Sequence, residues 1–130
     1  MKHVVFVDST VSGLLAFEAA KQLGCHVTFI HQRDASFLTI SIKDDTSRLE
    51  PYLRYVDTYL RIDNLEDGEF SQLLANLHAE RPIDALLSTS EAAILPVARE
   101  AQRIGTPYPR YEALWGAVYK SQLRETLRAH

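Results

Sequence analysis

Two short loops carry the side chains whose types and spacing could do chemistry. The first is Asp8-Ser9-Thr10-Val11-Ser12-Gly13, directly after the apolar run 3–7, and the second is Ser88-Thr89-Ser90-Glu91. Both loops are rich in hydroxyl groups, and each comes directly before a pattern with helical spacing. Free N–H groups at a helix start attract anions such as carboxylate or phosphate. The candidate binding residues are therefore Ser9, Thr10, Ser88, Ser90 and Glu91.

An ordinary structural role competes with this interpretation. Serine, threonine and aspartate are the usual N-cap residues, because their side chains accept hydrogen bonds from the first N–H groups of a helix. A glutamate in the first turn, which Glu91 would be, is favoured by the helix dipole. Capping alone could account for both loops, so the sequence leaves the two interpretations open.

Three familiar phosphate-binding sites do not fit the first loop. A dinucleotide site has G-x-G-x-x-G after its first strand and an acid at the end of the second. Here the loop has one glycine and the second apolar run ends at His31-Gln32, which disfavours a nicotinamide-dependent oxidoreductase. The P-loop motif is absent from the sequence. A phosphate-accepting receiver domain is also a poor fit, because Asp57 lies within the third apolar run and not at its end.

The remaining polar residues give no catalytic or metal-binding pattern. No two histidines have ligand spacing with a partner acid, so we expect surface or hydrogen-bonded roles for His3, His26, His31, His78 and His130. The single cysteine, Cys25, cannot form an internal disulfide and is expected to be a buried thiol. No catalytic residue and no metal ligand is assigned from the sequence.

The segments that must position the two loops alternate between strand and helix. Apolar and β-branched runs predict strands at 3–7, 26–31, 55–62 and 84–88. Helical spacing predicts helices at 11–23, around 70–77 and at 90–103. Gly24 and Gly105 are expected to end the first and the third of these helices. Residues 32–54 are expected to form a loop with a short helical piece.

This alternation predicts an α/β fold of the Rossmann-like, three-layer kind. We expect a parallel sheet of about four strands in the order 3-2-1-4. Ligands of such sheets bind beyond the carboxyl ends of the strands, where the strand order reverses. That point lies between strands one and four, so the two hydroxyl-rich loops are expected to meet there.

The bulk composition limits the classes of partner. The chain has 130 residues, which suggests one domain, and a net charge of −3, which gives no electrostatic case for nucleic acid or an anionic membrane. No apolar stretch approaches the roughly 18 residues of a membrane span. With no signal peptide at the start, a cytoplasmic location is the expectation.

The segment after Gly105 differs from the rest. Two prolines precede helical spacing that continues to His130 without a terminating residue. We therefore expect a domain at 1–107, a helical linker at 108–130, and a parent chain that continues. A basic stripe along this helix is either a solvated face or a cationic edge toward a phosphate, and consists of Lys120, Arg124 and Arg128.

Together these patterns resemble the N-terminal domain of ATP-grasp ligases, the biotin-carboxylase N-terminal-like domain. The opening VVFVDSTVSGLLAFEAAKQLGCHVTFI is similar to its first β-α-β unit. The run from Ser90-Glu91 through Ile104-Gly105 to Lys120 is similar to its end. In that family a linker lysine approaches the ATP phosphates; it maps to Lys120, with Tyr119 in place of the usual acid.

The resemblance implies a role in a larger enzyme. The parent would be a carboxylate–amine ligase, for example one that joins amino acids, acting through an acyl phosphate with ATP and Mg²⁺. ATP and Mg²⁺ would be bound by a downstream ATP-grasp domain, and no cofactor is expected to bind to this chain alone. The present domain would be inactive by itself and would form one wall of the site for a small carboxylate or amino-acid substrate. Pairing into a homodimer is compatible with the resemblance, and a free-standing Rossmann-like module that binds a small anion is the alternative.

Overall fold

The computed structural model describes residues 1–9, 12–32, 50–65, 68–88, 90 and 93–107. Strands and helices alternate along this part of the chain, as the sequence predicts. In chain order the elements are β1 (His3–Val7), a short 3-10 helix η1 (Ser12–Leu14), α1 (Leu15–Gln22), β2 (His26–Gln32), α2 (Glu50–Leu53), β3 (Thr58–Ile62), α3 (Gly68–Glu80), β4 (Ala85–Leu87) and α4 (Ile94–Ile104). The predicted linker at 108–130 lies outside the described residues.

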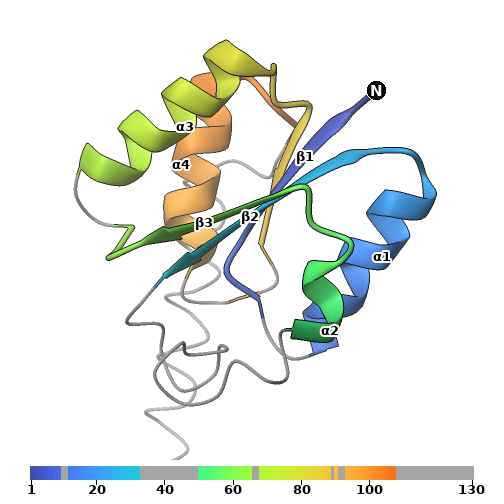
Figure 1. Cartoon of the computed structure of the whole chain (residues 1–130). Helices are drawn as coiled ribbons and strands as arrows, with labels where there is room; N and C mark the ends of the chain where they lie inside the picture. The colour runs from blue at the N-terminus through green and yellow to red at the C-terminus, as the bar shows by residue number, and fades with distance from the viewer. Residues whose placement is uncertain (10–11, 33–49, 66–67, 89, 91–92, 108–130) are drawn as a thin grey trace, which may run out of the picture.

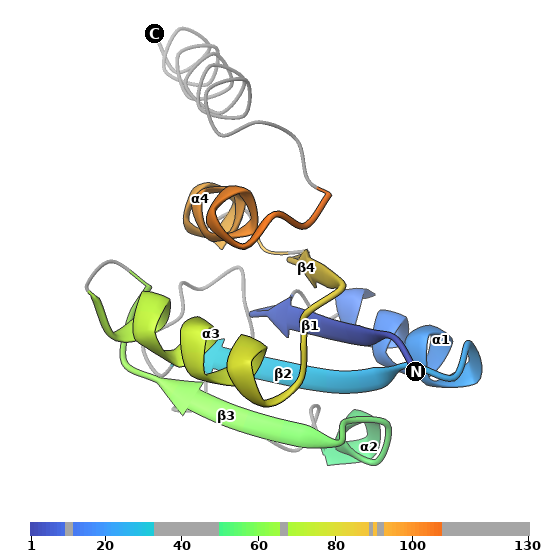
Figure 2. The ribbon, with the colours of Figure 1, turned by 90° about the horizontal axis from the view of Figure 1, so that it is seen from above.

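The four strands form one parallel sheet in the order β3-β2-β1-β4 (Figures 1 and 2). This confirms the predicted fold class and strand order. β1 lies in the middle, with Val4 opposite both Val27 and Ala85. Strands with neighbours on both sides and helices on both faces are buried all round, which is why β1 and β2 are continuous apolar runs.

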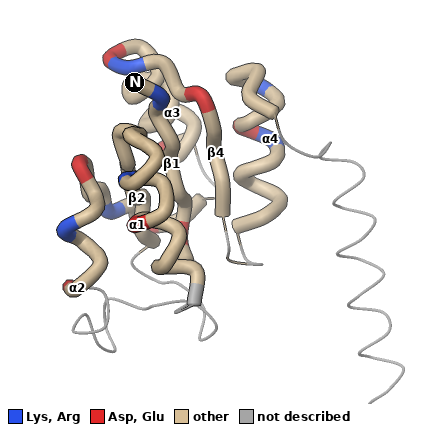
Figure 3. The backbone as a smooth tube through the Cα atoms, turned by 90° about the vertical axis from the view of Figure 1, so that its right-hand side faces the viewer, with Lys and Arg blue, Asp and Glu red and all other residues tan. Residues whose placement is uncertain are grey.

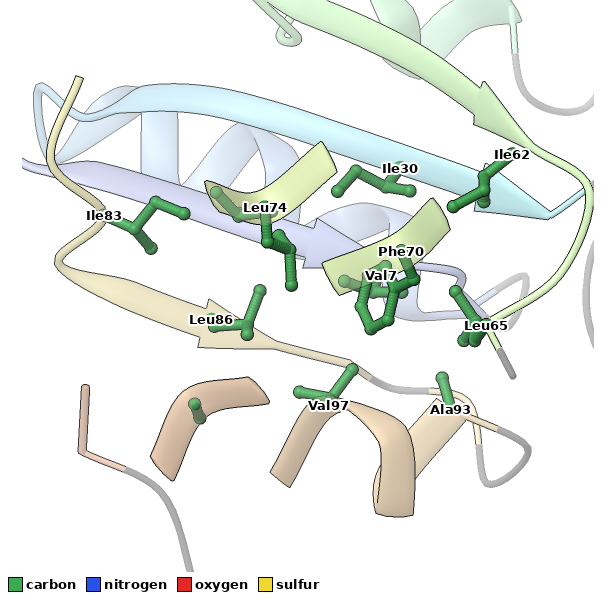
Figure 4. Packing of buried hydrophobic residues seen from close by; sticks show 12 residues of the cluster. Val7, Ile30, Ile62, Leu65, Phe70, Leu74, Ile83, Leu86, Ala93 and Val97 are labelled. Atoms are coloured by element: carbon green, nitrogen blue, oxygen red, sulfur yellow. The ribbon is translucent and has the colours of Figure 1, made fainter. Parts of the chain in front are cut away.

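Alternate residues of the strands pack into two separate cores, one on each face of the sheet. The fold therefore has three layers, with the sheet between two layers of helices (Figure 1). On one face, sheet residues such as Val7, Ile30 and Ile62 pack against α3 and α4 (Figure 4). On the other face, Phe6 and Phe29 pack against α1 and the segment around α2. Because successive side chains of a strand point to opposite faces, each strand contributes to both cores.

The third strand begins later than the sequence predicts. The apolar run starts at residue 55, but β3 starts at Thr58. Tyr55 and Val56 instead close a turn after α2, with N–H groups bonded to the carbonyls of Tyr52 at 3.1 Å and Leu53 at 3.0 Å. Their side chains pack into the core on the α1 face, so the same apolar character serves a turn and not a strand.

Both predicted helix-ending glycines adopt the left-handed conformation. Gly24 has φ of 80° and Gly105 has φ of 93°. After α1 the Gly24 N–H bonds to the Lys21 carbonyl at 3.0 Å and the Cys25 N–H to the Ala20 carbonyl at 3.1 Å. These two bonds form a Schellman motif, which satisfies carbonyls that the helix end would leave unpaired. The Cys25 thiol is buried, as predicted.

One ion pair ties α1 to the start of β3. The Lys21 ammonium lies 2.7 and 2.6 Å from the two carboxylate oxygens of Asp57, and the Val27 N–H donates to the same carboxylate at 2.8 Å. Partial burial alone would raise the pKa of Asp57, but the hydrogen bonds from Lys21 and Val27 and the attraction to Lys21 outweigh it. The pKa of Asp57 is therefore lowered.

This pair predicts a stability difference that depends on pH. A carboxyl group whose pKa is lowered by folding stabilises the fold above its ordinary pKa of 3.8, and the stabilisation is lost as the pH falls through the lowered value. Lys21→Gln should reduce the free energy of unfolding by about 0.5–1 kcal/mol near neutral pH. Urea titrations followed by circular dichroism should show this difference shrinking at acid pH. Lys2→Gln, at an exposed lysine outside the pair, is the control; a difference that stays constant with pH would contradict the assignment.

Candidate functional site

The carboxyl edge of the sheet brings the two hydroxyl-rich loops together. β1 and β4 are parallel neighbours with Phe6 opposite Leu87, so the chain leaves both strands at adjacent points. The order of the strands reverses between β1 and β4, which is where open parallel sheets bind their ligands. Of the predicted site residues, Ser9, Ser88 and Ser90 belong to the described part of this edge. The others lie outside the described residues: Thr10, Glu91 and Lys120.

Asp8 fixes the geometry of the first loop. Its N–H donates to the Ile30 carbonyl at 2.8 Å and extends the β1–β2 ladder by one bond. Its backbone then turns into the left-handed region with φ of 52°, which is uncommon for a residue other than glycine but best tolerated by aspartate and asparagine. The chain therefore bends at Asp8, directly after β1.

The Asp8 side chain clamps this turn to the end of β2. One carboxylate oxygen accepts the Gln32 N–H at 2.8 Å, and the other accepts the Gln32 side-chain amide at 2.5 Å. The side chain is buried, and this burial raises the pKa of Asp8 although the two bonds from Gln32 and the attraction to His31 act in the opposite direction. Each oxygen of the Asp8 carboxylate thus accepts a hydrogen bond from Gln32, and these two bonds hold the side chain in place.

The second loop is built around Ser88 and Ser90. The Ser88 hydroxyl accepts the Ser90 N–H at 3.0 Å, and the Ser90 carbonyl accepts the Ala93 N–H at 3.1 Å just before α4. Ser90 is 1% exposed, and its hydroxyl has no hydrogen-bond partner among the described residues. A buried hydroxyl without a partner is costly, which makes Ser90 a group that a ligand could satisfy.

A local structural role accounts for the Ser88 hydroxyl, which accepts the Ser90 N–H, but not for the Ser90 hydroxyl, which has no partner among the described residues. The N-cap residues are Leu14 for α1 and Ala93 for α4, and neither helix has a side-chain capping bond there. α4 begins later than predicted, so Pro96 lies in its first turn, where no N–H is needed. Ser88 and Ser90 are therefore placed before the helix and remain candidates for ligand binding.

The sequence interpretation missed the partnership of Asp8 and Gln32. From the sequence alone, Asp8 is expected to be an ordinary capping residue, and Gln32 stands where a dinucleotide site would have an acid. The available signal was an aspartate directly after a buried strand, a position from which a short carboxylate reaches the neighbouring strand end. Ser9, predicted as a binding residue, is buried beside this clamp at 2% exposure.

The histidines take the satisfied roles that the sequence predicts where the structure describes them. His3 is bonded to Thr28 and to the Arg81 carbonyl, His31 to the Tyr59 hydroxyl, and His78 accepts the Ile83 N–H. Among the described residues, no three side chains of histidine, cysteine, aspartate or glutamate are grouped to hold a metal ion. No helix in that same part of the chain is long and apolar enough to cross a membrane.

A comparison with protein families matches most of this chain. The model of the family described as the ATP-grasp N-terminal domain matches residues 17–108. This range includes most of α1, the second to fourth strands and α4. No protein of curated function matches the sequence.

Several solved enzyme structures contain a region with the same fold as this chain. An L-amino acid ligase from Bacillus licheniformis superposes with a TM-score of 0.65 at 19% identity, covering 88% of this chain and 26% of that one. A phosphoribosylglycinamide synthetase from Anaerococcus prevotii gives 0.61 at 21% identity, with 86% and 24% covered. The biotin carboxylase subunit of a pyruvate carboxylase gives 0.56 at 19% identity, with 88% and 24% covered. The chain thus spans about a quarter of the length of each.

Proposed function

The chain belongs to the ATP-grasp N-terminal domain family, and from this membership we propose that it forms the N-terminal domain of an ATP-dependent ligase that joins a carboxylate to an amine. The single observation that carries the proposal is the family match over residues 17–108. Since the similar solved chains are about four times as long, the proposal assigns the remainder of the enzyme to a downstream ATP-grasp domain. Residues 1–107 would form the domain and 108–130 the linker.

The proposed reaction has two steps. In the first step an oxygen of the substrate carboxylate attacks the γ-phosphorus of ATP and the bond from that phosphorus to the β-phosphate oxygen breaks. ADP is released, and the substrate becomes an acyl phosphate. The amine nitrogen then attacks the acyl carbon, the carbon–oxygen bond to phosphate breaks, and inorganic phosphate and a proton are released. Bound Mg²⁺ would offset the charge on the transferring phosphoryl group.

This chain would contribute one wall of the substrate site and no catalytic residue. The buried hydroxyl of Ser90 would donate to the substrate carboxylate at the carboxyl edge. Ser88, whose hydroxyl bonds to the backbone of Ser90, would line the site beside it. The Asp8–Gln32 clamp would hold the adjoining loop in position. The further proposed contacts are Ser9, Thr10 and Glu91 for the substrate and Lys120 for the ATP phosphates.

An amino acid is the substrate class that we propose. Support comes from the L-amino acid ligase, whose fold superposes on 88% of this chain. We also propose a cytoplasmic location, where ATP is available, and a homodimer is compatible with the proposal. The ligase proposal does not depend on the substrate class, the location or the oligomeric state.

The test uses the native gene product that extends beyond His130. With ATP, Mg²⁺ and mixtures of amino acids, we expect ATP binding by calorimetry and phosphate release that requires an amino acid. The chain that ends at His130 should show neither. If the extended protein binds no ATP, the ligase proposal is wrong and a free-standing module that binds a small anion becomes the better description.

A serine variant in the same assay tests the proposed wall. Ser90→Ala should raise the KM for the amino-acid substrate about tenfold, the equivalent of one lost hydrogen bond, and leave the KM for ATP unchanged. Thr106→Val removes a hydroxyl beyond the far end of α4 and serves as the matched control. Equal substrate KM values for Ser90→Ala and the unaltered enzyme would remove Ser90 from the site.

A further inference from the structure

A hollow of about 190 Å³ lies at the edge of the sheet opposite the candidate site. Its floor comes from the amino-terminal ends of the strands, with His3, His26, Thr28 and Thr58. Its wall is the end of α3, with Leu77, Glu80 and Arg81. The proposed ligase reaction uses none of these residues, so the hollow needs its own explanation.

The floor is polar where the pattern of the sheet calls for apolar residues. In register His3 lies opposite His26, and Thr28 lies opposite Thr58, all on the face that α3 covers. Farther along this face the same strands carry Val7, Ile30 and other apolar residues of the core (Figure 4). A layer of imidazole and hydroxyl groups under a helix end leaves a cavity that apolar packing would have filled.

Hydrogen bonds from His3 hold the hollow in shape. His3 Nδ1 lies 3.0 Å from the Arg81 carbonyl, and His3 Nε2 lies 2.7 Å from the Thr28 hydroxyl. A carbonyl only accepts, so Nδ1 carries a proton, and in the neutral imidazole Nε2 accepts from the Thr28 hydroxyl. The Thr28 oxygen is then left with acceptor capacity only. The backbone of Arg81 is fixed by this buried histidine, which fixes the mouth of the hollow to its floor.

Two opposite charges at the mouth have no ion-pair partner in the described part of the chain. Glu80 and Arg81 are consecutive and exposed, and where the chain leaves α3 Figure 3 shows an acidic and a basic position side by side. Neither side chain forms an ion pair or a hydrogen bond with any described residue, although both line the hollow. The carboxyl end of α3 adds negative potential on the Glu80 side, which favours a cationic group there.

His26 completes the floor as a neutral donor or acceptor. Its pKa is lowered, first by burial and next by the nearby Arg81 charge, with small contributions from His3 and Lys21, while Asp57 acts in the opposite direction. Its Nε2 lies 3.4 Å from the Thr58 hydroxyl, a long contact that a ligand could replace. At neutral pH His26 is therefore a polar but mostly uncharged part of the floor.

We propose that this hollow binds a small amino acid as its zwitterion. The carboxylate would pair with Arg81, the ammonium group with Glu80 and the Thr28 oxygen, and a small side chain would contact Leu77. An anion alone would be repelled by Glu80, and a cation alone by Arg81, so the paired charges favour a ligand that carries both. The hollow lies away from the carboxyl edge, so this inference does not depend on the ligase proposal.

The first test is a titration of the ¹⁵N-labelled chain with L-alanine, followed by amide chemical shifts. We expect saturable shifts at Thr28, Thr58 and 77–81, with a Kd of the order of 1 mM. Acetate and ethylamine, which carry one charge each, should bind at least about tenfold more weakly. Shifts at Ser88 and Ser90 would report the proposed substrate wall separately, so the two proposals can fail independently.

Two charge-removing variants make the test specific. Arg81→Gln and Glu80→Gln should each weaken L-alanine binding about tenfold or more. Arg61→Gln and Glu50→Gln, at exposed positions outside the hollow, should leave it unchanged. Acetate binding as tightly as L-alanine, shifts confined to the carboxyl edge, or unaltered binding in either hollow variant would each overturn the proposal.

Discussion

Phe29→Ala should lower the free energy of unfolding by about 3–5 kcal/mol, the range for a large aromatic removed from a packed core. Phe29 has no exposed surface and lies in the core between the sheet and α1. Its ring centroid is 4.8 Å from that of Phe17, 5.3 Å from that of His31 and 5.7 Å from that of Tyr59. Truncation would leave all three rings facing a void.

The expected loss is a large share of the stability of a domain this size, which is typically about 5–15 kcal/mol. Urea denaturation followed by circular dichroism would measure it. Leu23→Ala, at a side chain that is 82% exposed, should change the unfolding free energy by less than about 0.5 kcal/mol. A loss of under about 1 kcal/mol for Phe29→Ala would mean that this core collapses around the missing ring.

Asp8→Ala should cost about 2–4 kcal/mol, because two donors of Gln32 lose their acceptor in a buried place. Alanine is also disfavoured at φ of 52°, whereas glycine is not. Asp8→Gly should therefore be no less stable than Asp8→Ala, although glycine usually destabilises. Asp8→Asn keeps one acceptor and tolerates the backbone, so its cost should be the smallest of the three.

The pH dependence of Asp8→Asn has a definite sign. Burial raises the pKa of Asp8, so the folded state loses stability as the pH rises from the ordinary value of 3.8 through the raised one. Asparagine does not ionise, so the deficit of Asp8→Asn relative to the unaltered chain should shrink over this window. Glu50→Gln, at an exposed acid in α2, is the control. A deficit that grows with pH would contradict the assigned burial of the Asp8 charge.

Much of the fold was predictable because burial on both faces of a parallel sheet leaves a clear mark on the sequence. The runs at β1 and β2 are continuous and apolar, and Gly24 and Gly105 end their helices as predicted. The start of β3 was not predictable, since Tyr55 and Val56 are as apolar in a packed turn as in a strand. Local pattern alone does not distinguish these two uses.

The candidate site was predictable only in part. Strand order was enough to bring Ser88 and Ser90 beside the first loop, but Thr10, Glu91 and Lys120 remain predictions. The clamp between Asp8 and Gln32 joins residues 24 positions apart, and the polar floor of the hollow joins three strands. Such groupings depend on register, which becomes visible only when the strands are paired.

The position of β1 between β2 and β4 also bears on the order in which the chain folds. β1 can pair with β2, the next strand along the chain. Its other edge pairs with β4, which directly follows Asp84, a residue 81 positions after His3. Closing so long a loop is entropically unfavourable, and contacts of this separation slow folding. During synthesis the amino-terminal half of the sheet can therefore form first. The pairing of β1 with β4, and with it the candidate site at their carboxyl ends, would then form last and complete the topology.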